Sequence, residues 1–241
     1  CKVMLGSTEG EAIMALNHRR KPFSDVRVRQ ALTHAIDREA VIEGALAGYG
    51  QMIGSHYPPN LPDYVDYTGL YPYDPAKAKE LLAEAGHPNG FEMQLILPPF
   101  PYARRSGEII QAYLAQVGVN ASIEVYQGPQ WLSEVFREFV YDATIIAHTE
   151  PFDFGNYARE DWYIGYDNPA FKEVIEKYTL SNDAAERSEL AKEAQKMLAE
   201  DAVVVFLFQL PKTGVARAGI EGLWLNAPVQ ANDVTEAYWT E

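Results

Sequence analysis

The spacing of apolar positions along the chain predicts a mixture of helices and strands. Some segments repeat apolar residues with the 3.6-residue period of an amphipathic helix, and others are short apolar or alternating runs typical of strands. The predicted helices are residues 26–36, 38–46, 76–85, 104–117, 131–139, 169–180 and 184–200. The predicted strands are residues 13–17, 91–97, 119–126, 142–147 and 203–208.

Residues typical of helix starts support several of these predicted helices. Asp25 and Asp37 each precede an apolar-periodic run, where a short acceptor side chain can cap free backbone N–H groups. Asp74 and Pro75 open a third helix with cap and proline in the preferred order. The intervening residues 51–73 predict a long loop rich in Pro and Tyr, and loops of this length are often functional.

Residues 91–147 give the clearest indication of architecture. Their order is strand, helix, strand, helix, strand, which predicts neighbouring parallel strands joined by right-handed crossovers. The almost wholly apolar run 203–208 is expected to be central in the same sheet. The predicted fold class is therefore α/β, with a mixed, mostly parallel sheet flanked by helices.

The loops that follow the three strands of this block are the predicted ligand site. Ligands of open α/β sheets bind beyond the carboxyl ends of the strands, and these loops combine aromatic rings with a few charged groups. The candidate ligand-binding residues are Phe100, Tyr102, Arg104, Trp131, His148, Glu150, Phe152 and Asp153, with Tyr57 from the long loop. For some of these residues a structural role stays open beside the ligand role. Trp131 would pack its helix onto the sheet, Arg104 would pair with an acidic residue, and His148 would pair with Glu150.

Composition excludes several classes of function. Twenty basic and thirty-four acidic residues give a net charge of -14, which argues against a nucleic-acid partner. The single Cys1 excludes an internal disulfide and a cysteine-based zinc cluster. The five histidines lie far apart in sequence without ligand spacing, so we expect no metal site and no cofactor.

Enzyme signatures are also missing from the sequence. It has no nucleophile elbow, P-loop, Rossmann glycine fingerprint or His-Glu-x-x-His pattern. We therefore expect that the protein is not an enzyme. Glu150 and Asp153 could be imagined as the carboxylate pair of a hydrolase, the alternative from a different class. No apolar run is long enough to span a bilayer.

Residues 21–38, KPFSDVRVRQALTHAIDR, closely resemble the signature of the family 5 extracellular solute-binding proteins, the peptide and nickel receptors of ABC importers. The resemblance continues in residues 73–86 (YDPAKAKELLAEAG) and 103–119 (ARRSGEIIQAYLAQVGV), with shorter matches at 167–171 and 194–201. It implies a type II periplasmic-binding-protein-like lobe. Residues 1–17 would be a hinge-crossing strand, 18–210 the C-terminal ligand-binding lobe, and 211–241 a tail returning to a missing N-terminal lobe. Cys1 then marks a chain cut from a longer one; the alternative is the acylated first residue of a lipoprotein.

The resemblance also implies a function. The protein would bind a peptide or similar amine-bearing solute, outside the cell or in the periplasm, and deliver it to membrane permease subunits. Glu150 or Asp153 would neutralise the cation of the solute. Dipeptide receptors of the family place Trp-x-x-Asp after the strand matching 142–147 and an Arg near the end of the strand matching 91–97. This chain has His148 to Pro151 and Leu97 to Pro99 there. Nickel, metal-chelate and sugar receptors, or a chaperone or signalling role, remain alternatives.

Overall fold

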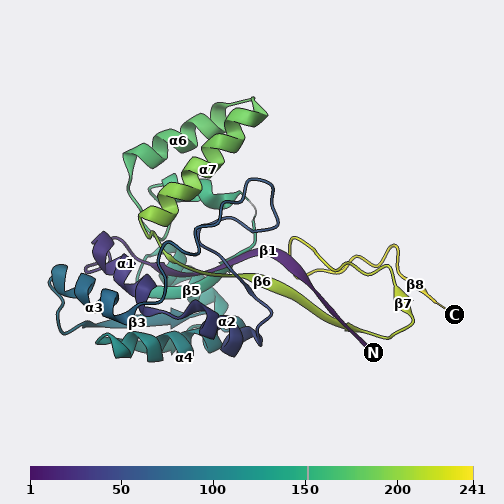
Figure 1. Ribbon diagram of the computed structural model, residues 1–241, viewed down its shortest axis with the longest axis horizontal. Helices are drawn as coiled ribbons and strands as arrows, with labels where there is room; N and C mark the ends of the chain where they lie inside the picture. The colour runs from purple at the N-terminus through teal and green to yellow at the C-terminus, as the bar shows by residue number, and fades with distance from the viewer. Residues whose placement is uncertain (151, 241) are drawn as a thin grey trace.

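A computed structural model describes residues 1–150 and 152–240. Its centre is a six-stranded sheet in the order β2-β6-β1-β5-β3-β4, with helices on both faces (Figure 1). A two-stranded ribbon, β7 (Ile220–Glu221) with β8 (Tyr238–Trp239), lies apart from it. The predicted α/β class and mixed sheet are confirmed, but only two of the five strand pairings in this sheet are parallel and three are antiparallel.

The predicted parallel block is confirmed as well. β3 (Phe91–Leu97) pairs in parallel with β4 (Val119–Val125) on one side and with β5 (Ala143–His148) on the other. The crossover from β3 to β4 is α4 (Pro101–Gln116). The crossover from β4 to β5 is not the α-helix expected at 131–139. It is a short α5 (Gly128–Gln130) followed by a π-helical segment, η1 (Trp131–Arg137).

Two long antiparallel strands complete the sheet, and both exceed their predictions. β1 (Lys2–Leu16) and β6 (Val205–Ala216) pair from Lys2↔Ala216 to Ser7↔Pro211, then shift register before Glu11↔Gln209. The first part of this pair leaves the sheet as an arm (Figure 1). The central position expected for residues 203–208 is wrong, because β6 lies between β1 and the two-residue edge strand β2 (Gln51–Met52). Its apolar run reflects burial on both faces.

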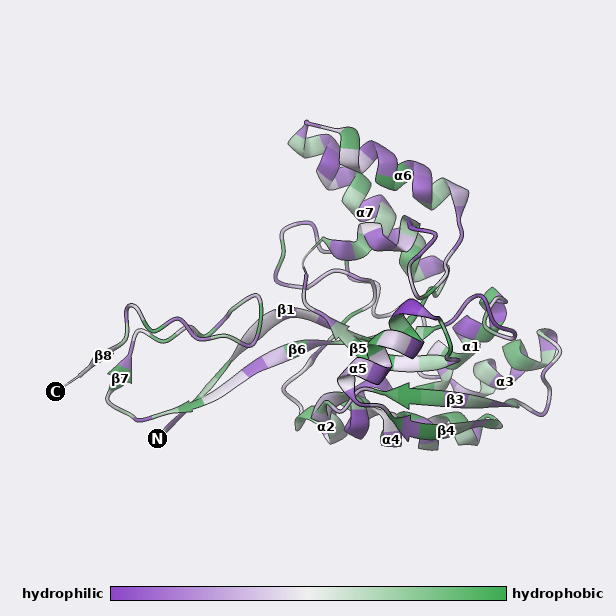
Figure 2. Cartoon of the chain, turned by 180° about the vertical axis from the view of Figure 1, so that it is seen from behind, coloured by the Kyte–Doolittle hydropathy of each residue, from purple (hydrophilic) through white to green (hydrophobic). Residues whose placement is uncertain are grey.

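The two faces of the sheet bury separate cores. Met14 and Leu16 of β1 face the layer of α1 (Val26–Ala35), α2 (Arg38–Leu46), α3 (Pro75–Glu84) and α4. Ile13 and Ala15, on the opposite face, join an aromatic-rich core beneath α6 (Pro169–Leu180) and α7 (Ala184–Glu200). Figure 2 shows the apolar strands between these helical layers.

The helix starts read from the sequence are confirmed by hydrogen bonds. The side chain of Asp25 accepts from the backbone N–H of Arg27, and that of Asp37 accepts from the N–H of Ala40. Asp74 accepts from two N–H groups at the start of α3. Each carboxylate satisfies donors that a helix cannot satisfy internally.

Two buried arginines join segments that lie far apart in sequence. Arg29 donates from Nε to the carbonyl of Ala202 (3.1 Å), and its two terminal nitrogens donate to Phe23 (2.9 Å) and Asp201 (2.9 Å). Arg38 is equally buried and donates to four carbonyl oxygens, those of Ile53, Thr68, Tyr71 and Phe206. These guanidinium groups satisfy carbonyls of loops and of β6 that would otherwise lack these donors.

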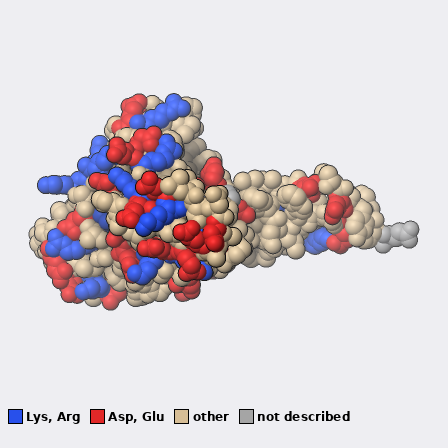
Figure 3. Space-filling view, turned by 90° about the horizontal axis from the view of Figure 1, so that it is seen from above, with Lys and Arg blue, Asp and Glu red and all other residues tan. Residues whose placement is uncertain are grey.

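The C-terminal tail runs back along the arm. The Ala227 N–H donates to the carbonyl of Ser7 (3.1 Å), and the Glu9 N–H donates to that of Pro228 (2.9 Å). In Figure 3 charged side chains of both signs cover the body, whereas much of the arm shows neither. Large apolar side chains lie exposed on the arm and tail: Val3, Leu5, Val215, Trp224, Leu225, Val229, Val234, Tyr238 and Trp239.

Candidate functional site

The carboxyl ends of four strands lie on the side of the sheet from which the arm departs. β5 and β6 both run antiparallel to β1, and β3 and β4 run parallel to β5. Strands β3, β4 and β5 therefore end at one rim, while β6 continues past it into the arm (Figure 1). This rim is where an α/β sheet collects the loops and helix N-termini that bind ligands.

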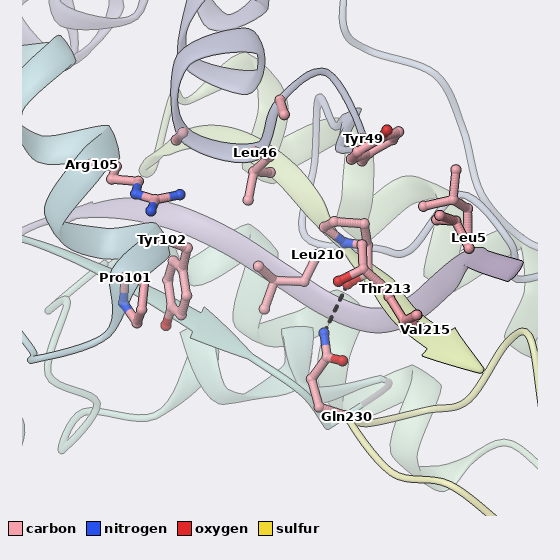
Figure 4. A pocket seen from close by; sticks show the side chains of 15 residues that line it. Leu5, Leu46, Tyr49, Pro101, Tyr102, Arg105, Leu210, Thr213, Val215 and Gln230 are labelled. Atoms are coloured by element: carbon pink, nitrogen blue, oxygen red, sulfur yellow. Dashed lines mark hydrogen bonds between the residues drawn. The ribbon is translucent and has the colours of Figure 1, made fainter. Parts of the chain in front are cut away.

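A cavity of about 730 Å³ opens between this rim and the arm (Figure 4). Tyr102 and Arg105 come from the start of α4, Tyr49 from the segment after α2, and Leu5 and Val215 from the arm. The lining is mostly apolar, and Arg105 is its one charged side chain among the described residues. Apolar walls with one well-placed charge are typical of small-molecule sites.

The start of α4 brings positive charge to the lining of this cavity. Phe100 precedes the helix without capping it through a side-chain hydrogen bond, and Pro101 occupies the first turn. The positive end of the helix dipole therefore adds to the charge of Arg105. Tyr102 stacks on the half-exposed Phe100 with ring centroids 5.8 Å apart, and its hydroxyl accepts from the N–H of Ala147 (2.9 Å). Burial raises the pKa of Tyr102 to about 12, so its hydroxyl stays neutral.

A second group, the buried polar cluster, lies at the end of β5. Its members are Glu11, His56, His148 and Asp153. Nε2 of His56 lies 2.5 Å from Oδ1 of Asp153 and 3.3 Å from Oε2 of Glu11. Nδ1 of His148 lies 3.1 Å from the other oxygen of Asp153. Their side chains are 1–9% exposed.

Two tyrosine hydroxyls complete the surroundings of the cluster. The hydroxyl of Tyr157 lies 3.1 Å from Nδ1 of His56, and that of Tyr163 lies 2.9 Å from Nε2 of His148. Each imidazole thus has a carboxylate on one nitrogen and a hydroxyl on the other.

The pKa values of the two acidic side chains in the cluster shift in opposite directions. Burial, reinforced by the charge of Asp153, raises the pKa of Glu11 well above its usual value. Burial alone would also raise the pKa of Asp153. Interaction with His56 and hydrogen bonds from both histidines outweigh burial and hold that pKa below its usual range. Asp153 is therefore ionised, while Glu11 favours its neutral form.

The structure separates the predicted site residues into exposed and buried groups. Glu150 is exposed, and one of its oxygens accepts from the N–H of Thr149 (3.2 Å). Phe152 is half-exposed with a left-handed backbone (φ 67°), while Arg104 is exposed outside the cavity. Trp131 is buried, as the packing alternative expected, and its Nε1 donates to the hydroxyl of Thr144 (2.9 Å).

The remaining predicted residues lie inside the protein. Tyr57 is 1% exposed and its ring lies beside that of Phe152. His148 pairs with Asp153, so the structure does not form the alternative pairing of His148 with Glu150. Pro151, which belongs to the same loop, lies outside the described residues.

Three contributors were not among the sequence candidates. The cavity contains Arg105 and not the neighbouring Arg104, because consecutive helical residues point about 100° apart. Glu11 faces His148 across the antiparallel pairing of β1 with β5, a contact that depends on strand register. His56 comes from the long loop, and its ring lies 5.3 Å from that of His148 despite their distance in sequence. The histidine spacing therefore did not reveal the donor atoms that the structure groups.

No helix among residues 1–150 and 152–240 combines the length and apolar character needed to cross a membrane.

Comparison with known proteins gives relatives of one kind. Heme-binding protein A of Haemophilus influenzae is 42% identical over 121 residues, covering 48% of this chain and 22% of that protein. The dipeptide-binding protein of Escherichia coli is 32% identical over 216 residues, covering 80% of this chain and 39% of that protein.

A solved structure shares the fold. The periplasmic binding protein DppA from Helicobacter pylori, in complex with the peptide STSA, superimposes with a TM-score of 0.85 at 24% identity. The comparison covers 100% of this chain and 49% of that one. The predicted periplasmic-binding-protein-like fold is thereby confirmed, and the chain spans less than half the length of each of these three proteins.

The family described as "Bacterial extracellular solute-binding proteins, family 5 Middle" matches residues 4–169. That match covers most of the sheet, the cavity-lining start of α4 and the loop after β5. The chain belongs to the family 5 bacterial extracellular solute-binding proteins.

Proposed function

We propose that this chain is the ligand-binding lobe of an ABC-importer receptor that binds a peptide or a similar small solute. The observation that carries the proposal is the mostly apolar cavity at the strand ends, with Arg105 beside the α4 N-terminus. Family membership supports it, since the family consists of solute-binding proteins and not of enzymes. Relatives named for dipeptide, glutathione and heme binding support a small organic solute.

The exposed arm supports a partner lobe on the far side of this cavity. Its exposed residues include Val3, Val215 and Trp239, each more than 60% exposed. Contiguous apolar surface of this kind marks an interaction site in soluble proteins. We propose that residues 1–17 cross a hinge, 18–210 form the C-terminal lobe and 211–241 return to the N-terminal lobe. Closure of the two lobes around the solute, outside the cell or in the periplasm, would then present the receptor to permease subunits.

The charges near the rim favour a solute with both a carboxylate and an amine. Arg105 has no acidic partner within ion-pair distance among the described residues, so its guanidinium is available to an anion. Glu150 is exposed and can take a cation. Asp153 has both oxygens engaged by histidines, which leaves Glu150 as the better of the two predicted acids for this role.

We expect Arg105→Ala to weaken solute binding about 10- to 100-fold in the full-length protein, because one charge-assisted hydrogen bond in a partly enclosed site is lost. Arg104→Ala is the matched control and should change affinity less than about 2-fold, since that side chain lies outside the cavity. Isothermal calorimetry measures both. Equal losses in the two variants would remove Arg105 from the site.

We expect Glu150→Gln to weaken binding of amine-bearing solutes about 10-fold and to leave binding of their N-acetylated forms unchanged, because only the ammonium group needs the carboxylate. Calorimetry with matched free and acetylated peptides measures the difference. If the variant binds both forms as the wild type does, Glu150 does not contact the amine.

A ligand screen tests the function as a whole. Thermal shifts of the full-length protein are measured with di- to nonapeptides, glutathione, heme and sugars, beside a hydrolase assay on the same compounds. Saturable stabilisation without turnover by a peptide-like solute supports the proposal. Turnover, or stabilisation by sugars alone, contradicts it.

A further inference from the structure

The buried polar cluster contains an oxygen that the protein leaves unsatisfied. Oε2 of Glu11 has no hydrogen-bond partner within the described part of the chain, although the residue is only 1% exposed. Native proteins satisfy nearly all buried polar atoms, because an unpaired one retains the full cost of losing water. This unpaired oxygen, 3.3 Å from Nε2 of His56, is therefore available to a further group in the cluster.

The charges of the cluster indicate the same deficit. Two carboxylates lie almost without solvent exposure beside two imidazoles. The other cationic side chains near the site do not supply the balance, since none of the described lysines or arginines forms an ion pair with Glu11 or Asp153. A buried divalent cation would supply positive charge beside both carboxyl groups at once.

The positions of the donor atoms fit a metal ion. Donor atoms of His56, His148 and Asp153 all lie within 4.8 Å of one another, while Glu11 lies beside this group with Oε2 3.3 Å from Nε2 of His56. Zinc bonds to nitrogen and oxygen are about 2.0–2.2 Å, which places tetrahedral donors roughly 3.3–3.5 Å apart. The 3.1 Å separation between His148 and Asp153 is near that value, whereas the 2.5 Å between His56 and Asp153 would lengthen around an ion.

The outer contacts of both histidines suit ligation. A ligating imidazole must present a bare nitrogen to the metal and donate from its other nitrogen. The hydroxyls of Tyr157 and Tyr163 face these other nitrogens at 3.1 Å and 2.9 Å. A hydroxyl oxygen accepts hydrogen bonds, so each tyrosine can accept from the N–H on the ring nitrogen that faces away from the ion.

We propose that the buried polar cluster binds one divalent transition-metal ion of the zinc type. Two imidazoles and the carboxylate of Asp153 form the ligand set, which favours zinc or cobalt over calcium and magnesium, whose ligands are oxygens alone. The ion would join the long loop after β2, the end of β5 and the start of η2 (Asp153–Ala158), with Glu11 of β1 beside it. His148 and Asp153 bracket the loop with Glu150 and Phe152, so the metal would fix both ends of a rim loop.

The test is zinc binding by the full-length protein after treatment with a chelator. Isothermal calorimetry with zinc chloride should give one tight site per molecule, and calcium chloride should give none. His56→Gln should weaken zinc binding at least about 100-fold, since loss of even an outer-shell partner typically costs 10- to 100-fold. His87→Gln, outside the cluster, is the matched control and should bind as the wild type does.

Two further measurements test the proposal even if His56→Gln does not fold. Tyr157→Phe keeps all three ligands and should weaken binding about 10- to 100-fold through the lost outer contact. Cobalt bound to the wild type should give the intense visible absorption of a tetrahedral site. Absence of a one-to-one zinc site in the wild type overturns the proposal. So does zinc binding that Tyr157→Phe and His56→Gln leave unchanged.

Discussion

Replacing Arg29 by alanine is expected to destabilise the protein by about 3–5 kcal/mol. The change leaves the carbonyls of Phe23, Asp201 and Ala202 buried without their donor, and each such loss costs about 1–3 kcal/mol before the surroundings relax. Urea unfolding of the full-length protein, followed by circular dichroism, measures the change. Arg29→Lys should recover only part of it, because one ammonium group cannot reach three separated carbonyls.

Arg27→Ala is the matched control, two residues away in the same helix. Arg27 lies exposed and pairs with Asp25 on the surface, where such pairs contribute little. The unfolding midpoint of the Arg27→Ala variant should stay close to that of the wild type. If both alanine variants unfold alike, the buried hydrogen bonds of Arg29 do not hold α1 to the segment before β6.

Gly90→Ala is expected to cost about 3–4 kcal/mol, for two separate reasons. Gly90 has a φ of 74°, in the left-handed region where a side chain costs about 1–2 kcal/mol. An added Cβ would also lie 1.8 Å from the carbonyl oxygen of Gly118, a backbone atom that cannot move aside easily. Because the two glycines lead into β3 and β4, the collision would separate the starts of these paired strands.

Alanine variants at two other glycines distinguish the cost of backbone strain from the cost of steric collision. Gly86 has a φ of 88° with no atom within 4 Å of the added Cβ, so Gly86→Ala should cost only about 1–2 kcal/mol. Gly69 has neither problem, and Gly69→Ala should be neutral or stabilise by up to about 1 kcal/mol. Thermal and urea unfolding of the three variants give the ranking. A Gly86→Ala loss as large as that of Gly90→Ala would show that the collision with Gly118 is relieved at no cost.

Elements governed by local chemistry were predictable from the sequence. The acceptors Asp25, Asp37 and Asp74 each stand one residue before a helix, and capping requires only that short spacing. The parallel pairing of β3 with β4 and β5 follows from the alternation of strands and helices, because crossovers constrain where the next strand can lie.

Features that depend on distant pairing were not predictable. Apolar content predicted a central β6, but helices and loops cover a penultimate strand just as fully. Glu11 joins the buried polar cluster through the register of β1 on β5, and His56 does so through the path of a long loop. Neither the register nor the path leaves a periodic trace in the sequence. Arg105 was missed for a smaller reason, since one helical step decides which of two adjacent arginines enters the cavity.

The structure also gives a physical reason for the most recognisable segment of the sequence. Arg27 and Arg29 look equivalent in the printed pattern, yet one is exposed and the other buried against carbonyls. Arg38, at the end of the same segment, is buried in the same way beside the long loop. Residues 21–38 therefore organise the body of the fold, while the ligand contacts proposed above come from other segments.

The pairing of Lys2 with Ala216 brings the two ends of the segment 2–216 to neighbouring positions. A segment whose ends meet can be transplanted between two adjacent residues of a host protein without stretching it, and can be circularly permuted with a short connecting peptide. The same geometry lets one such module be exchanged for another of different ligand preference during evolution, while the remainder of the polypeptide keeps its shape.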